Sequence, residues 1–177
     1  MEVTDYSKEY KDKPLVGKHS ALFPKNWFCV IAGATGCGKI ILLTNLLRKA
    51  SLKFSDFYIY CATVHQDAFA NLRKHFEEQE KAMKLDYTRR FNREKIIKNG
   101  HFFDNDGDIL DSKDLDPNLN HVIVFDDVLL KDQQKIKEYF CTGRHNNVNV
   151  FYLVQSLFKI QKHCIRENTN TRLRLHY

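Results

Sequence analysis

A glycine-rich loop that ends in a lysine is the first feature of this sequence that could do chemistry. Gly33, Gly38 and Lys39 have the spacing of the phosphate-binding loop, or Walker A motif, in which four residues separate two glycines and a lysine follows. Glycines let the backbone curl until its N–H groups face a phosphate, and Lys39 can neutralise the β- and γ-phosphates. The loop therefore predicts ATP binding by Gly33, Ala34, Thr35, Gly36, Cys37, Gly38, Lys39 and Ile40.

The last position of this motif departs from the pattern. A serine or threonine there supplies a hydroxyl ligand to Mg²⁺, whereas this chain has Ile40. Isoleucine resembles threonine in shape but cannot bind a cation. We therefore expect ATP to bind and metal-dependent hydrolysis to be impaired. A glycine-rich turn that binds nothing is the less favoured alternative, because an apolar strand precedes the loop and an apolar helix follows it.

A pair of carboxylates follows a second apolar run. The run Val122-Ile-Val-Phe125 precedes Asp126 and Asp127, which is typical of a Walker B strand. We predict that Asp126 holds Mg²⁺, directly or through water, and that Asp127 orients or deprotonates the attacking water. The alternative is that both aspartates only cap a helix.

Further polar candidates lie downstream of the carboxylates. Gln155 ends another apolar run, where its side chain could sense the γ-phosphate. Arg144 and Arg166 are each a candidate arginine finger or phosphate sensor, a group that stabilises charge in the transition state. Each arginine taken alone is more often a solvated surface charge, so both interpretations stay open.

The remaining clusters of potential metal ligands do not indicate a metal centre. The five cysteines form no Cys-x-x-Cys pair, which favours reduced thiols over a zinc site or disulfides. Six aspartates lie between residues 104 and 116, but a calcium loop starting at Asp104 would need glycine sixth and glutamate twelfth. Those positions hold Ile109 and Leu115, so we reject a calcium site.

The elements that must position these residues follow from short apolar runs that alternate with helical periodicity. We expect strands at 27–32, 56–62, 121–125 and 148–154. We expect helices at 40–50, 66–84 and 132–141, the last capped by Asp132. Strands that are solidly apolar are buried on both faces, which predicts a mainly parallel sheet with helices on both sides, a three-layer α/β/α class.

Length and composition fit one such domain. The chain has 177 residues, of which 43% are hydrophobic, and its formal net charge of +6 permits a polyanionic partner. Residues 1–24 read as a flexible lead-in and residues 25–177 as the ATPase domain. No apolar run approaches the roughly 20 residues that span a bilayer. The first ten residues are polar and acidic, so we expect neither a signal peptide nor a membrane partner.

These motifs together resemble one family. The phosphate loop at 33–39, the carboxylate strand at 122–127, Gly-Arg-His at 143–145, and Gln155-Ser156 followed by Ile-Arg-Glu-Asn at 165–168 are similar to the poxvirus-type DNA-packaging ATPases of the HerA/FtsK superfamily. Relatives occur in other large DNA viruses, virophages and Maverick/Polinton transposons. The resemblance covers about residues 22–170 and implies a RecA-like P-loop NTPase core.

The resemblance also implies a function. It implies a homo-oligomeric ring that hydrolyses ATP to move double-stranded DNA into a capsid, in the nucleus or in a cytoplasmic virus factory. It assigns Lys39 to the phosphates, Asp126 to Mg²⁺, Asp127 to the attacking water, Gln155 to sensing and Arg144 to a finger that acts across a subunit boundary. Basic patches would meet DNA phosphates, although the basic run at 73–98 is equally a solvated helical face.

Two features depart from the family pattern and keep other interpretations open. Ile40 is the first. Residues 169–177 are the second, because they do not look like the apolar strand that the family would place there. We therefore expect a C-terminally shortened or decayed copy, whose alternative function is that of a catalytically impaired nucleotide- or DNA-binding remnant. A small nucleoside kinase is less favoured, since such kinases usually lack the Asp-Asp strand with a downstream Gln-Ser.

Overall fold

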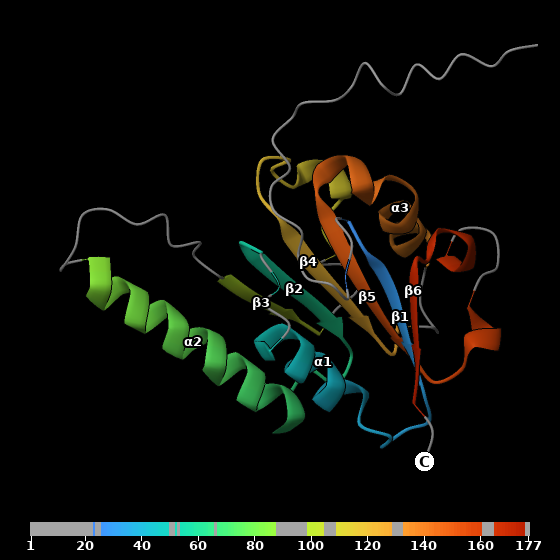
Figure 1. Ribbon diagram of the computed structural model, residues 1–177, viewed down its shortest axis with the longest axis horizontal. Coiled ribbons are helices and arrows are strands. Elements are labelled where there is room, and N and C mark those ends of the chain that lie inside the picture. Colours follow the sequence, from blue (N-terminus) through green and yellow to red (C-terminus); the bar gives the residue numbers. More distant parts are fainter. Residues whose placement is uncertain are drawn as a thin grey trace, which may run out of the picture.

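The centre of the protein is a six-stranded sheet in which every neighbouring pair is parallel (Figure 1). This computed structural model describes residues 23, 26–49, 52, 54–65, 67–87, 99–104, 109–128, 133–160 and 165–175. The strands are β1 (Phe28–Ala32), β2 (Asp56–Cys61), β3 (Asn99–Phe103), β4 (His121–Asp126), β5 (Val148–Val154) and β6 (Thr171–Arg174). Their order across the sheet is β3-β2-β4-β5-β1-β6.

Helices cover both faces of the sheet, as the sequence predicts. On one face α1 (Lys39–Lys49) and α2 (Asp67–Tyr87) bury Leu43, Leu47, Phe69 and Leu72 against the strands. On the other face α3 (Gln134–Thr142) buries Ile136, Tyr139 and Phe140. Short 3₁₀ turns complete the fold at Ser112–Asp114, Gly143–Asn146 and Leu157–Lys159.

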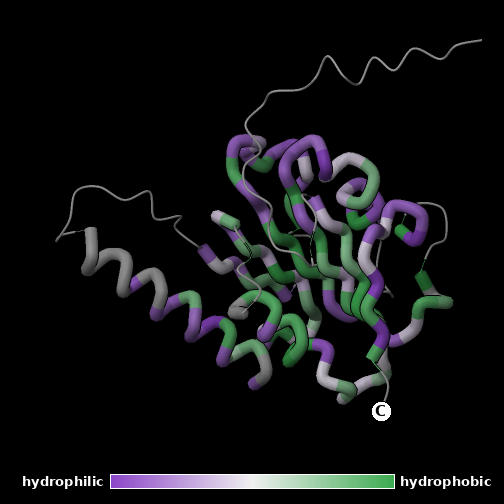
Figure 2. The backbone as a smooth tube through the Cα atoms, viewed as in Figure 1, coloured by the Kyte–Doolittle hydropathy of each residue, from purple (hydrophilic) through white to green (hydrophobic). Residues whose placement is uncertain are grey.

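The central strands are buried on both sides because their sequences are apolar throughout. Every residue of β1, β4 and β5 is buried, including the polar residues His121, Asp126 and Asn149. Hydrophobic colouring accordingly concentrates on the strands in Figure 2. Two separate apolar layers result, one on each face of the sheet. The strands that are apolar throughout, and can therefore be predicted from the sequence, are the ones that form the hydrophobic core.

The strand that lies between β1 and β4 is β5, which follows both in the chain. The chain between Lys39 and Asp126 includes β2, α2 and β3, and the two strands extend the sheet beyond β4. The chain then returns through α3 to place β5 between β1 and β4. The number of residues between the two motifs therefore reflects the strands beyond β4, and not the strand that lies between β1 and β4.

Two strands differ from the sequence expectation. The prediction of no strand after residue 169 is wrong, because β6 pairs with β1 over four residues, from Cys29 opposite Thr171 to Ala32 opposite Arg174. An edge strand needs apolar residues on one face only, and here Leu173 packs inward while Arg172 and Arg174 are exposed. β3 was not predicted at all, since its sequence mixes polar and aromatic residues at the opposite edge.

The helix boundaries agree with the sequence to within three residues. α2 ends at Tyr87 rather than at residue 84, and α3 begins at Gln134. The predicted cap Asp132 and nearly all of the predicted lead-in at 1–24 lie outside the described residues. No helix in the described ranges is both long and apolar enough to cross a membrane. Within the same ranges, no group of three or more His, Cys, Asp or Glu side chains is arranged to hold a metal ion.

Asn149 joins the amino ends of the three central strands and gives the first prediction. Its fully buried side chain accepts from the Trp27 backbone N–H (3.1 Å) and donates to the His121 carbonyl (3.2 Å). Asn149→Ala leaves both groups without this partner, so we expect the free energy of unfolding to fall by about 2–4 kcal/mol. Urea unfolding measures the loss. The exposed Asn45→Ala on α1 is the control and should change stability by less than about 0.5 kcal/mol; equal losses would contradict the prediction.

Candidate nucleotide-binding site

The predicted site residues other than Arg144 meet at the carboxyl edge of the sheet, where β1, β4 and β5 end together. Ala32 lies opposite Val154, and Asp126 lies opposite Leu153. The Gly33 backbone N–H donates to the Val154 carbonyl (3.1 Å), which ties the start of the loop to the residue before Gln155. The phosphate loop, the two aspartates and Gln155 therefore converge, although they are up to 122 positions apart in the chain.

The loop has the tightly curled shape that its glycines predict. Gly36 and Gly38 have φ angles of 79° and 86°, in the left-handed region that glycine tolerates best. At Gly33 a Cβ atom would lie only 2.4 Å from the Cys37 sulfur, so a larger residue there would force the loop open. The Cys37 backbone N–H donates to the Ala34 carbonyl (3.2 Å) and closes the turn. Residues 34–36 are exposed, so the concave backbone is accessible to a ligand.

Lys39 at the start of α1 bends back across this loop. Its Nζ donates to the Gly33 carbonyl at 2.8 Å and to the Ala34 carbonyl at 3.0 Å. An ammonium group carries three donors, so a further acceptor can be added without breaking either bond. The loop thus presents one positive charge beside the α1 N-terminus, an arrangement suited to an anion.

Asp126 is a nearly buried carboxylate at the end of β4. It is 7% exposed, and burial raises its pKa to about 6. The hydrogen bond from Cys61 and the charge of Lys39 act to lower that pKa, whereas the negative charge of Asp127 raises it further. Buried carboxylates with raised pKa values cluster at functional sites, because a fold otherwise avoids their desolvation cost.

Asp127 and Gln155 are bonded directly to each other. The Gln155 Nε2 donates to both carboxylate oxygens of Asp127, at 3.1 Å each. Both side chains are exposed, and Asp127 has a left-handed backbone with φ of 57°. Aspartate tolerates that conformation better than most residues, which explains how the chain can turn sharply away from the sheet here. The sequence predicted a role for each residue separately, Asp127 toward the attacking water and Gln155 toward the γ-phosphate. Nothing in the sequence indicated that the two side chains contact each other.

Ile40 and Ile41 follow the loop lysine in different environments. Ile40 is half-buried and packs against the apolar layer under α1 and α2. Ile41 is 67% exposed. The position that would carry a hydroxyl in the usual motif is therefore occupied by a side chain engaged in apolar packing.

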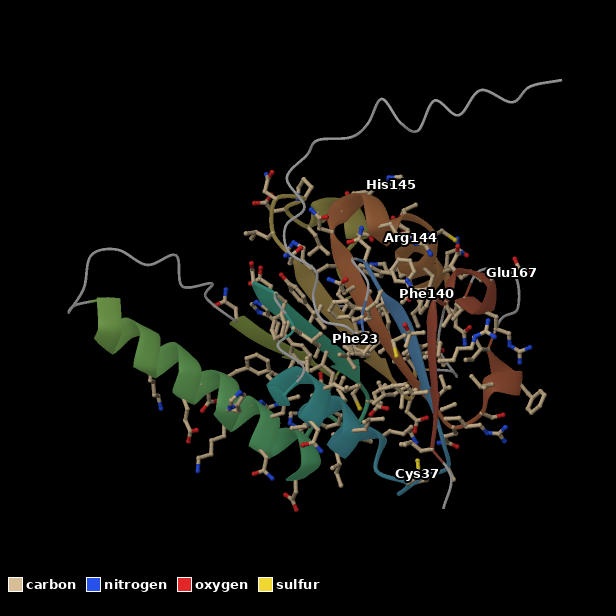
Figure 3. The ribbon with its side chains drawn as sticks, viewed as in Figure 1. Phe23, Cys37, Phe140, Arg144, His145 and Glu167 are labelled. Atoms are coloured by element: carbon tan, nitrogen blue, oxygen red, sulfur yellow. The ribbon has the colours of Figure 1, made fainter. Side chains whose placement is uncertain are left out.

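The two arginine candidates occupy different places. Arg144 lies just before β5, at the amino edge of the sheet, with its guanidinium 5.1 Å from the centre of the Phe28 ring and its Nη2 donating to the Asn168 carbonyl (3.2 Å). Figure 3 shows Arg144 at the opposite end of the sheet from Cys37 of the loop. Arg166 donates to the Leu157 carbonyl from its Nε (3.0 Å). Neither arginine shares a hydrogen bond with the loop, Asp126 or Gln155 among the described residues.

Sequence reasoning missed Cys61, the last residue of β2. Its sulfur donates to Asp126 Oδ2 (3.4 Å), and burial raises the pKa of the thiol to about 11. Thr63 Oγ1 lies 3.3 Å from the same sulfur. The available signal was positional: Cys61 is the second-last residue of the predicted strand at 56–62, and parallel strands bring their carboxyl ends to the same edge.

Comparison with solved structures gave partial matches at low sequence identity. The cytoplasmic domain of EssC has a TM-score of 0.48 at 12% identity, with 85% of this chain and 33% of that chain covered. EssC (ATPases 2 and 3) from Geobacillus thermodenitrificans has a TM-score of 0.46 at 14% identity, covering 85% of this chain and 32% of that one. For EccC (ATPases 2 and 3) from Thermomonospora curvata, in complex with a signal sequence peptide, the values are 0.44, 14%, 83% and 30%. The chain thus spans about a third of each of these proteins.

Comparison with sequences is more specific. No curated protein matches the chain. The family model of the Poxvirus A32 protein matches residues 18–172, which is most of the chain and includes the phosphate loop, the carboxylate strand and Gln155. The all-parallel sheet with helices on both faces and a phosphate loop after β1 confirms the expected α/β fold of a RecA-like P-loop ATPase. The chain belongs to the poxvirus A32 protein family of packaging-type P-loop ATPases.

Proposed function

We propose that this chain binds ATP at the loop 33–40 and is an ATPase domain whose turnover serves the translocation of double-stranded DNA. The observation that carries the proposal is the convergence of the curled loop, Lys39, the Asp126-Asp127 pair and Gln155 at one edge of the sheet. A positive nest beside a buried carboxylate and an exposed carboxylate–amide pair supplies the groups needed for phosphoryl transfer to water.

The loop and Lys39 would hold the nucleotide. Backbone N–H groups of residues 34–38 would face the β-phosphate, and the α1 N-terminus would favour its charge. Lys39 Nζ, now bonded to the Gly33 and Ala34 carbonyls, would add a bond to the β- or γ-phosphate. Gly38 has open space where a Cβ would lie, so the backbone can be approached closely at that point.

The residues present also fit a magnesium ion, though with fewer protein ligands than usual. Magnesium is commonly bound through one or two carboxylates and the substrate phosphates, with several waters retained. Asp126 is the carboxylate that would hold it, beside Lys39 and the loop. Ile40 contributes no oxygen. When bound, the ion would neutralise charge on the phosphates, and Asp126 would be its main protein ligand.

Asp127 and Gln155 would act on the reacting end of the nucleotide. Asp127 would orient the attacking water and accept its proton, since it is exposed and adjacent to Asp126. Gln155 would donate its amide to the γ-phosphate. Because that amide is bonded to Asp127 here, engagement of the phosphate would change the hydrogen bonds of both side chains together.

Arg144 would act on the nucleotide of a neighbouring copy rather than on its own. It is exposed, and it lies at the edge of the sheet opposite the loop. A head-to-tail arrangement of copies, which closes into a ring, would bring such a residue to the next site. The net charge of +6 is compatible with salt-dependent contacts to DNA. Membership of the family supports two further parts of the proposal, a capsid protein partner and action in the nucleus or a cytoplasmic virus factory.

The second candidate is a domain of the same fold that binds nucleotide or DNA with impaired turnover. The observation that favours it is the packing of Ile40 against the apolar layer in place of a hydroxyl. The two candidates share the binding step and differ only in hydrolysis. A measurement of the rate of ATP hydrolysis therefore distinguishes the two candidates.

Ile40→Thr tests the division between binding and turnover. We expect both the parent and this variant to bind a fluorescent ATP analogue, and we expect Mg²⁺-dependent turnover to rise about tenfold or more in the variant, which corresponds to about 1.4 kcal/mol of barrier. The exposed Ile41→Thr is the matched control and should not raise turnover. Equal turnover in the parent and Ile40→Thr would contradict the impairment, and failure of both to bind nucleotide would contradict the proposed function.

Asp126→Asn tests the cost of the buried carboxylate. The folded-state pKa is about 6 and an unfolded aspartate titrates near 3.9, so the folded state holds the extra proton between these values. The contribution of Asp126 to stability therefore falls as pH rises through that window. We expect the nucleotide-free variant to be more stable than the parent at pH 7.5 by up to about 2 kcal/mol, and this advantage to shrink near pH 4.

Urea unfolding at both pH values measures this difference. Asp127→Asn is the control at the neighbouring exposed carboxylate, where asparagine keeps the left-handed backbone, and should change stability by less than about 0.5 kcal/mol. If Asp126→Asn is less stable than the parent at pH 7.5, the prediction is contradicted. The carboxylate would then stabilise the fold instead of being kept for a ligand.

A further inference from the structure

Cys61 lies beside Asp126 at the carboxyl edge of the sheet. The strands that carry them, β2 and β4, are neighbours in the sheet (Figure 1). The two residues are register partners in the parallel pair, although they are 65 positions apart in the chain. The Cys61 side chain is 2% exposed and belongs to the apolar layer under α1 and α2. It therefore sits on the inner side of the proposed metal ligand, away from solvent.

The hydrogen bonds around the Cys61 sulfur form a chain in which Thr63 donates to the thiol and the thiol donates to Asp126. The thiol donates its one hydrogen to Asp126 Oδ2 (3.4 Å). The Thr63 backbone N–H donates to the sulfur (3.4 Å), and Thr63 Oγ1 lies 3.3 Å from it. Because the only thiol hydrogen is used on Asp126, the Thr63 hydroxyl must be the donor in its own contact. Thr63 thus fixes the thiol, and the thiol fixes one oxygen of the carboxylate.

The other carboxylate oxygen is left for a ligand. Among the described residues, Asp126 Oδ1 has no hydrogen-bond partner, while Oδ2 is held by Cys61. We propose that Cys61 and Thr63 are positioning residues of the nucleotide site, which hold Asp126 so that Oδ1 faces a divalent cation bound with the nucleotide. The inference rests on the proposed function and adds to it the groups that orient its metal ligand.

The orientation of the Asp126 carboxylate matters more here than in the usual motif, because position 40 has no hydroxyl that could also bind the cation. Asp126 would be the main protein oxygen on the cation, so a carboxylate free to rotate would lose more affinity here than in a site with two protein ligands. Partners that orient a metal ligand commonly contribute 10- to 100-fold, to order of magnitude, in metal affinity. The alternative role for Cys61 is apolar packing alone, which serine would fulfil less well than alanine.

The test measures Mn²⁺ binding by electron paramagnetic resonance, with ADP present, for the parent, Cys61→Ala and Cys61→Ser. We expect Cys61→Ala to weaken Mn²⁺ binding about tenfold, and we expect Cys61→Ser, which keeps a donor, to stay within about threefold of the parent. Thr63→Val, at an exposed position, should weaken Mn²⁺ binding about threefold, and Thr63→Ser should restore it. Binding of a fluorescent ADP analogue in EDTA should be the same in all of them.

Cys29→Ala is the matched control, since Cys29 is a fully buried thiol of the same apolar layer on β1. Its Mn²⁺ affinity should equal that of the parent. Equal affinities in Cys61→Ala and Cys61→Ser, or an equal loss in Cys29→Ala, would overturn the inference and indicate packing alone. Parent protein that binds the ADP analogue in EDTA but shows no change in Mn²⁺ affinity in any variant overturns only this inference. Parent protein that binds no nucleotide overturns the proposed function as well.

Discussion

Parallel pairing of β5 with both β1 and β4 is the constraint on which the candidate site depends. Strands that run in the same direction end at the same edge, so the loop after β1, the aspartates after β4 and Gln155 after β5 meet without any further element. The buried amide of Asn149 holds the opposite ends of these strands in register. A slip of one residue would turn Asp126 to the other face of the sheet, toward α3 and away from Lys39.

Much of this arrangement is predictable because burial on two faces leaves a strong mark in the sequence. β1, β2, β4 and β5 are nearly continuous apolar runs, and the phosphate loop follows directly from glycine spacing. The grouping of the loop, Asp126 and Gln155 was predictable too, since each follows such a run. Edge strands leave a weaker mark. β3 and β6 need apolar side chains on one face only, and their sequences alone do not distinguish them from loops.

What sequence could not predict is contact between side chains from distant segments. The bond from Gln155 to Asp127 joins positions 28 apart, and the bond from Cys61 to Asp126 joins positions 65 apart. Both depend on strand order: the first on β5 pairing with β4, and the second on β2 pairing with β4 while β3 lies outside it. The place of Arg144 at the far edge has the same origin, because a residue just before a strand and a residue just after one lie a strand length apart.

The left-handed backbone at Asp127 can be formed by residues with or without a carboxylate, so the shape of the turn does not depend on its charge. Asparagine and glycine satisfy the same φ angle as well as aspartate, whereas β-branched residues do not. Substitution of Asp127 by either residue would therefore keep the turn and remove the carboxylate. The fold at this turn and the proposed water-orienting carboxylate can thus be separated by a single substitution that leaves the domain intact.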